Sequence, residues 1–153
     1  MIQSVKKAFV VGMSAILLVG CSGLMLPTNY EDFHEKAMEI NEEENPEIAK
    51  IRVKAEANDT KYNVAFNMVT GEPVEEYSED ENEFLAGALI LMAFADVKSI
   101  ENNEDYKYYV GDGFKVVTDK ETFVWNKYGY LKEVSGKDDD GKKVSINYTY
   151  TYK

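Results

Sequence analysis

After residue 20, the chain has a single long run of hydrophobic residues, from Phe84 to Ala95. A helical projection of this run shows no polar face, and a helix that is apolar on every side is normally buried on every side. The run is too short to cross a bilayer, which takes about 20 apolar residues. The pattern therefore predicts a central helix, from about Asp80 to Val97, that the rest of the fold covers.

Alternating apolar and polar residues on both sides of this run predict β-strands. Before the run, Ile51 to Ala57 and Tyr62 to Met68 alternate around the turn Asn58-Asp59-Thr60, as in a hairpin with one buried face. After the run we expect an antiparallel meander, because only short turns separate the apolar segments. Its strands should cover about 106–110, 114–118, 122–126, 130–135 and 142–152.

An amphipathic helix is expected near the start of the domain. Apolar residues recur at helical spacing from Tyr30 to Ile40, with Thr28 as the N-cap, Glu31 as its capping-box partner, and Asn45-Pro46 as the stop. The predicted fold class is α+β. We expect a curved antiparallel sheet of about seven strands packed around one apolar helix, with this N-terminal amphipathic helix.

Residues 1–20 have the pattern of a bacterial secretion signal. Lys6 and Lys7 give the positive start, and Ala8 to Val19 form the apolar stretch. The segment ends in Leu18-Val19-Gly20-Cys21, which resembles the lipobox of bacterial lipoproteins. In that family a diacylglycerol is attached to the cysteine and a peptidase cuts just before it. The alternatives are a transmembrane anchor or an ordinary buried cysteine.

The resemblance implies that residues 1–20 are removed, that residues 21–26 are the lipidated Cys21 and a short tether, and that residues 27–153 form one domain. The domain would lie on the exported side of the cell membrane or outer membrane. Two acyl chains hold a protein firmly at a bilayer, and a lipobox cysteine carries at least two. Cys21 is the only cysteine, so the exported domain forms no internal disulfide and depends on its core.

The chain is acidic, with 28 Asp and Glu against 17 Lys and Arg and a net charge of −11. Loss of Lys6 and Lys7 with the signal makes the mature chain more acidic still. No basic cluster is visible along the sequence. We therefore expect a soluble domain that stays off anionic headgroups and does not bind nucleic acid.

No candidate catalytic or metal site stands out in the sequence. His34 is the only histidine, and the acidic segment Glu72–Glu83 lacks the ligand spacing and turn glycine of a calcium site. Asp138-Asp139-Asp140-Gly141 fails as an EF-hand, because Gly136 and Asn147 would fall on positions that must be acidic. We expect a hairpin turn there, and no enzyme, metal or cofactor.

The order of helix, hairpin, apolar helix and meander resembles the lipoprotein carriers typified by LolA, LolB and LppX, and also small envelope lipoproteins. The features behind this likeness are the helix Phe84–Ala95 and the late strands around Tyr128–Leu131 and Val144–Tyr152. In the carriers a curved sheet encloses an apolar cavity. The resemblance implies a cavity between sheet and helix, with candidate lining residues Phe84, Leu85, Leu89, Leu91, Met92 and Phe94.

Two functions stay open at this point. The first is a non-catalytic structural or protein-interaction module of the cell envelope, in contact with another envelope protein. The second is a carrier or binding module for a lipid or other apolar ligand. A carrier needs an empty cleft of about 300 Å³ or more, so the surroundings of the central helix distinguish the two.

Overall fold

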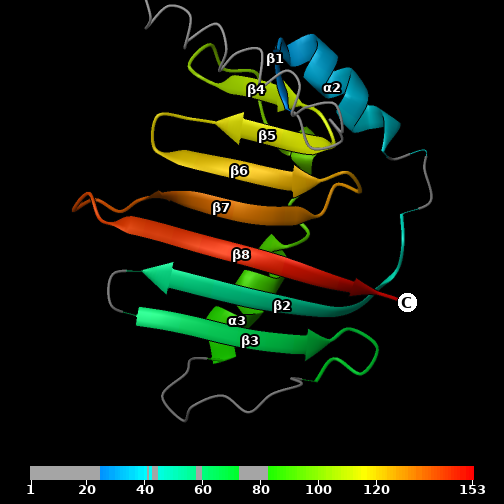
Figure 1. Ribbon diagram of the computed structural model, residues 1–153, viewed down its shortest axis with the longest axis vertical. Coiled ribbons are helices and arrows are strands. Elements are labelled where there is room, and N and C mark those ends of the chain that lie inside the picture. The colour runs from blue at the N-terminus through cyan, green and yellow to red at the C-terminus, as the bar shows by residue number, and fades with distance from the viewer. Residues whose placement is uncertain (1–24, 41, 43–44, 58–59, 73–82) are drawn as a thin grey trace, which may run out of the picture.

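The computed structural model describes residues 25–40, 42, 45–57, 60–72 and 83–153, the last range without the side chains of residues 83–86. Its strands are β1 (Leu26–Thr28), β2 (Ile48–Ala57), β3 (Thr60–Asn67), β4 (Lys107–Val110), β5 (Gly113–Val117), β6 (Glu121–Asn126), β7 (Leu131–Lys137) and β8 (Lys143–Tyr152). Its helices are α2 (Tyr30–Glu39), α3 (Glu83–Met92) and the 3-10 helix η2 (Val97–Ser99). The strands form one open antiparallel sheet in the order β1-β4-β5-β6-β7-β8-β2-β3 (Figure 1).

The hairpin before the central helix and the meander after it are confirmed, but the sheet has eight strands and not seven. The additional strand is β1. We had expected its first residue, Leu26, to belong to the tether and its last residue, Thr28, to cap the first helix. Leu26 pairs with Val110, and Thr28 pairs with Tyr108. Pro27 fits here because β1 is an edge strand, where a missing N–H need not remove a ladder hydrogen bond.

Helix α2 begins one residue later than its predicted cap would place it. The N-cap is Asn29, whose side chain accepts a hydrogen bond from the backbone N–H of Asp32 at 2.8 Å. Thr28 is not the cap because its backbone is part of β1. The helix ends at Glu39.

The buried side of α2 packs on the sheet at β4 and β5. Phe33 and Ala37 are buried, and the Phe33 ring lies 5.0 Å from the Tyr108 ring and 5.7 Å from the Phe114 ring, between centroids. The backbone nearest to α2 is that of β4 and η2. These aromatic contacts hold α2 over one end of the sheet.

Both helices cover the same face of the sheet. The cross-strand partners Tyr108, Val116, Phe123, Val134 and Ile146 share this face, and the core continues from them onto β2 and β3. Helix α2 covers the face at β4, and α3 crosses behind β8, β2 and β3 (Figure 1). The described helices leave the other face, turned toward the viewer, uncovered. Helix α3 therefore packs on one side of the sheet. We had expected the sheet to curve around this helix.

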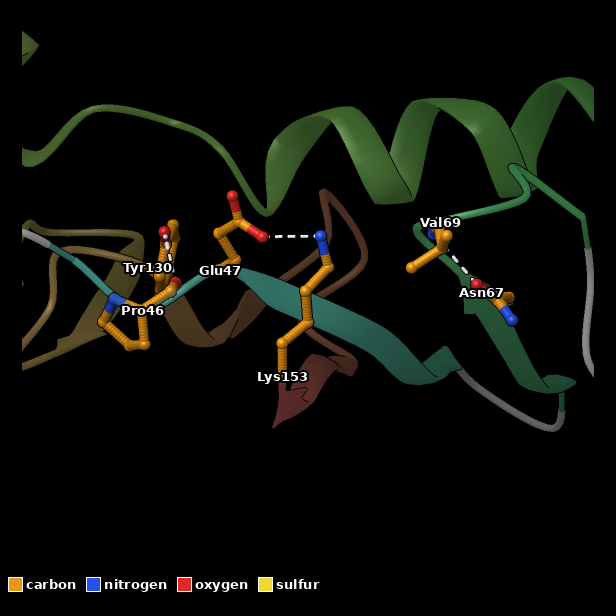
Figure 2. A network of polar contacts seen from close by, with 6 residues as sticks. All are labelled: Pro46, Glu47, Asn67, Val69, Tyr130 and Lys153. Carbon is orange, nitrogen blue, oxygen red and sulfur yellow. Dashed lines mark hydrogen bonds and ion pairs between the residues drawn. The ribbon is translucent and has the colours of Figure 1, made fainter.

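The end of β8 is fastened to the segment that leads into β2 (Figure 2). The Lys153 ammonium lies 2.5 Å from a carboxylate oxygen of Glu47, and the Lys153 N–H donates to the Glu47 carbonyl at 3.0 Å. Nearby, the Tyr130 hydroxyl donates to the Pro46 carbonyl at 3.2 Å. The hydrogen bond from Lys153 holds the pKa of the Glu47 carboxyl below its usual value, so the carboxylate stays charged until the solution becomes acidic.

Gly87→Ala should stabilise the domain by about 1 kcal/mol, because glycine is a poor helix former and this position has room for a methyl group. Gly87 is exposed on α3, and a Cβ there would meet no atom within 4 Å. Urea unfolding of both proteins measures the difference. The matched control is Gly113→Ala, whose Cβ would lie 2.4 Å from the Trp125 carbonyl oxygen, and which should lose roughly 1–3 kcal/mol. A loss of stability in Gly87→Ala would contradict the exposed placement of this side of α3.

Candidate functional site

The carboxyl-terminal end of α3 and the residues just after it are held to the sheet by hydrogen bonds to the main chain. The buried Tyr148 hydroxyl donates to the Leu89 carbonyl at 2.7 Å, and the Trp125 indole N–H donates to the Ala95 carbonyl at 3.0 Å. Leu89 is 5% exposed and Ala93 is fully buried. The space between the sheet and this part of the helix is therefore filled by packed side chains.

The cavity candidates do not gather around a common space. Of those whose side chains the structure describes, Leu89 faces the sheet, whereas Leu91, Met92 and Phe94 are 75%, 36% and 47% exposed. The side chains of Phe84 and Leu85 lie outside the described residues. The expectation that the central helix is covered on every side is wrong, because an open sheet gives α3 only one surface to pack on. We call the exposed side chains of Leu91, Met92 and Phe94 the α3 ridge.

A small hollow lies beside the α3 ridge. Phe94, Ile40 and Tyr130 contribute to its lining, and its volume is about 190 Å³. This is below the roughly 300 Å³ at which ligand pockets usually begin. The hollow therefore gives little support to a lipid site of the carrier type.

A row of tyrosines on β8 forms part of the core next to α3. The rings of Tyr148, Tyr150 and Tyr152 stack with successive centroid distances of 6.5 and 6.4 Å. The Tyr150 hydroxyl donates to the Leu131 carbonyl. Burial raises the pKa of Tyr148 to about 12 and also raises the pKa of Tyr150. These phenols are therefore neutral at physiological pH, and their hydroxyls serve the fold.

The uncovered face of the sheet is basic, although the protein is acidic. In β2, Lys50, Arg52 and Lys54 point to this face, while Ile51 and Val53 between them are fully buried on the other. The cross-strand pairs extend the same face over the whole sheet. Its basic residues are Lys50, Arg52, Lys54, Lys61, Lys107, Lys115, Lys137 and Lys143, and its acidic residues are Glu56 and Glu133. We call these residues together the basic face.

The expectation that no basic patch exists is therefore wrong. The basic residues are spread from residue 50 to residue 143 and come together only through strand pairing. Lys61 and Glu56 form an exposed ion pair at 3.8 Å, and Arg52 donates to the Asn63 side chain at 3.0 Å. In the part of the chain that the structure describes, the other lysines of the basic face form no ion pair.

Neutral hydrogen-bonding side chains lie among these charges. Strand β8 contributes Ser145, Asn147, Thr149 and Thr151, each directly opposite a residue of the basic face on β2. At one end of the face, an open hollow of about 970 Å³ is lined by Lys120, Lys137, Lys142 and Lys143 together with Glu56, Asp119 and Glu121. The face thus combines positive charge with hydroxyl and amide donors, which is the chemistry that binds anions.

The other residues considered for chemistry have ordinary surroundings. His34 is exposed and stacks on Tyr30 at 5.7 Å between ring centroids. The hairpin turn expected at 138–141 is confirmed, and the Asp138 carboxylate accepts from the N–H groups of Asp140 and Lys142. Within the described ranges, no three His, Cys, Asp or Glu side chains gather as a metal site would require.

Cys21 and residues 73–82 of the acidic segment lie outside the described residues. Among those that are described, no helix has the length and apolar character needed to span a membrane. No protein-family model, curated protein or solved structure matches this chain. The likenesses to bacterial lipoproteins and to lipoprotein carriers therefore stay predictions, and the candidate site rests on the geometry of the basic face.

Leu89→Ala should destabilise the domain by about 2–5 kcal/mol, because it leaves a cavity under α3. Leu91→Ala, two residues away on the exposed side, should change stability by less than about 0.5 kcal/mol. Urea melts of the two variants measure this contrast between neighbouring leucines in one helix. Similar losses in both would mean that a further layer covers α3.

Alkaline pH should unfold the domain through its buried phenols. The folded pKa of Tyr148, about 12, exceeds its ordinary value of 10, so the unfolded state ionises first. The stabilisation is fully present below pH 10 and is lost as pH rises toward 12. Denaturant melts at increasing pH measure the loss, and Tyr148→Phe should show a shallower decline. Constant stability across this range would contradict the burial of the β8 tyrosines.

Proposed function

We propose that this protein is a bacterial envelope lipoprotein, anchored through a lipid on Cys21, whose folded domain is a non-catalytic interaction module. The anchor is supported by the charged start, apolar stretch and Leu18–Cys21 box of the first segment. The interaction role is supported by one observation above all. A whole face of the eight-stranded sheet is uncovered by the described helices, and it is basic in a protein whose net charge is −11.

Interaction is favoured over lipid carriage by the way α3 packs. A carrier would need space between the sheet and this helix, but Leu89 and Ala93 fill that contact and are buried. The side chains that would have lined the space, Leu91, Met92 and Phe94, are exposed instead. An exposed apolar ridge and a basic face are contact surfaces, and they suit a module that acts by touching other envelope components.

Cys21→Ser tests the anchor directly. In a bacterial host the variant should accumulate as an uncleaved precursor, take up no labelled palmitate, and leave the membrane fraction. Ser22→Ala is the matched control, because it changes the next residue and keeps the box, and it should be processed like the original. A Cys21→Ser protein that is still cut before residue 21 and still acylated would refute the lipoprotein assignment.

Mass spectrometry of the lipid-anchored protein after organic extraction tests carriage in the same preparation. The proposal expects acyl chains bound covalently to Cys21 and no other lipid in stoichiometric amount. A second, non-covalent lipid at one copy per chain would favour the carrier function.

A further inference from the structure

We propose that the basic face lies against anionic headgroups of the membrane to which the protein is anchored, so that the domain rests flat on the bilayer with α2 and α3 turned outward. This inference rests on the proposed anchor at Cys21 and goes beyond it by naming the surface and the orientation. It reverses the expectation, drawn from net charge, that the domain stays off anionic lipid.

The first argument is the sign and spread of the charge. Lys50, Arg52 and Lys54 are spaced about 7 Å apart along one side of β2. Further lysines extend from Lys61 on β3 to Lys107 on β4, which is almost the full width of the sheet. A linear polyanion would contact only those basic residues that lie along one line across the sheet. A planar array of cations fits a planar array of anionic headgroups, which attract lysine and arginine near the surface.

The second argument is where the acidic residues lie. Helix α2 carries the exposed carboxylates Glu31, Asp32, Glu35 and Glu39 on the covered side of the sheet. A packed helix lies about 10 Å behind its sheet, and the Debye length at physiological salt is about 8 Å. The acidic residues of α2 are therefore screened from a bilayer that touches the basic face.

The third argument is the length of the tether. Only residues 22–24 separate Cys21 from Met25, so Cys21 lies within about 14 Å of Met25. Met25 borders a hollow of about 440 Å³ that is lined by residues from both faces of the sheet, with Val124 on the side of the basic face and Trp125 on the other. The short tether therefore keeps this edge of the domain close to the membrane, within reach of the headgroups.

The test compares the anchored protein on neutral and on anionic vesicles. The mature protein, with its lipid on Cys21, is reconstituted in phosphatidylcholine alone or with about one third phosphatidylglycerol. If Cys21 is unmodified in cells, the proposed lipoprotein anchor is wrong. A maleimide lipid coupled to this single cysteine then gives an equivalent anchor, so the orientation of the domain is still tested on its own. The rate at which each lysine is acetylated is then measured by mass spectrometry.

Lys54, Lys115 and Lys143 should react at least about threefold more slowly on anionic than on neutral vesicles, and high salt should remove the difference. Lys36 and Lys98, which lie on α2 and η2, should react equally on both. Lys50→Gln/Lys54→Gln should reduce the protection of Lys115 and Lys143. The control Lys36→Gln/Lys98→Gln removes the same charge from the other side and should leave the protection intact.

Equal rates on the two kinds of vesicle, or equal protection of every lysine, would overturn the proposal. Protection of the basic face by soluble inorganic polyphosphate, but not by anionic vesicles, would also overturn it and would assign this face to a soluble polyanion. Circular dichroism of both double variants establishes that each is folded.

Discussion

The pairing of β8 with β2 is the contact on which the rest of the domain depends. It joins the hairpin before α3 to the meander after it, with partners from Ile48 and Tyr152 to Ala57 and Val144. Side chains alternate between the two faces, so a shift of one residue would expose the core and bury the lysines. The ion pair between Lys153 and Glu47 fastens one end of this pairing (Figure 2). One register therefore decides both the core and the basic face.

The strands were predictable because each is buried on one face, and this leaves a period of two in the sequence. Strand β1 was not predictable, because Leu26-Pro27-Thr28 is too short to show a period. This segment becomes a strand only by pairing with β4. A helix was predicted correctly at α3, but it ends at Met92 and not near Val97, and its burial was not predicted correctly. An apolar helix indicates contact with a core, and Leu89 makes that contact. The exposure of Leu91 depends on whether another part of the fold covers the outer side of α3. The local sequence pattern of the helix carries no information about this.

The basic face was missed because charge was summed along the chain and not over the faces of the strands. The signal was present in Lys50, Arg52 and Lys54, which alternate with Ile51 and Val53. Since the apolar residues of a half-buried strand must face the core, the residues between them must face solvent. Extending this rule to the later predicted strands would have placed Lys107, Lys115 and Lys143 on solvent-facing positions as well. The net charge of −11 concealed this, because it adds the two sides of the sheet together.

The basic face and the α3 ridge lie on opposite sides of the sheet, so one flat partner cannot cover both. If the basic face rests on the bilayer, then Leu91, Met92 and Phe94 point away from it and toward the exported side. The two contacts also differ in physical character. The attraction of lysines to headgroups weakens as salt rises, whereas burial of apolar side chains does not depend on charge. Membrane contact therefore leaves the α3 ridge free, and a protein partner on the exported side would meet a surface whose orientation the bilayer has already set.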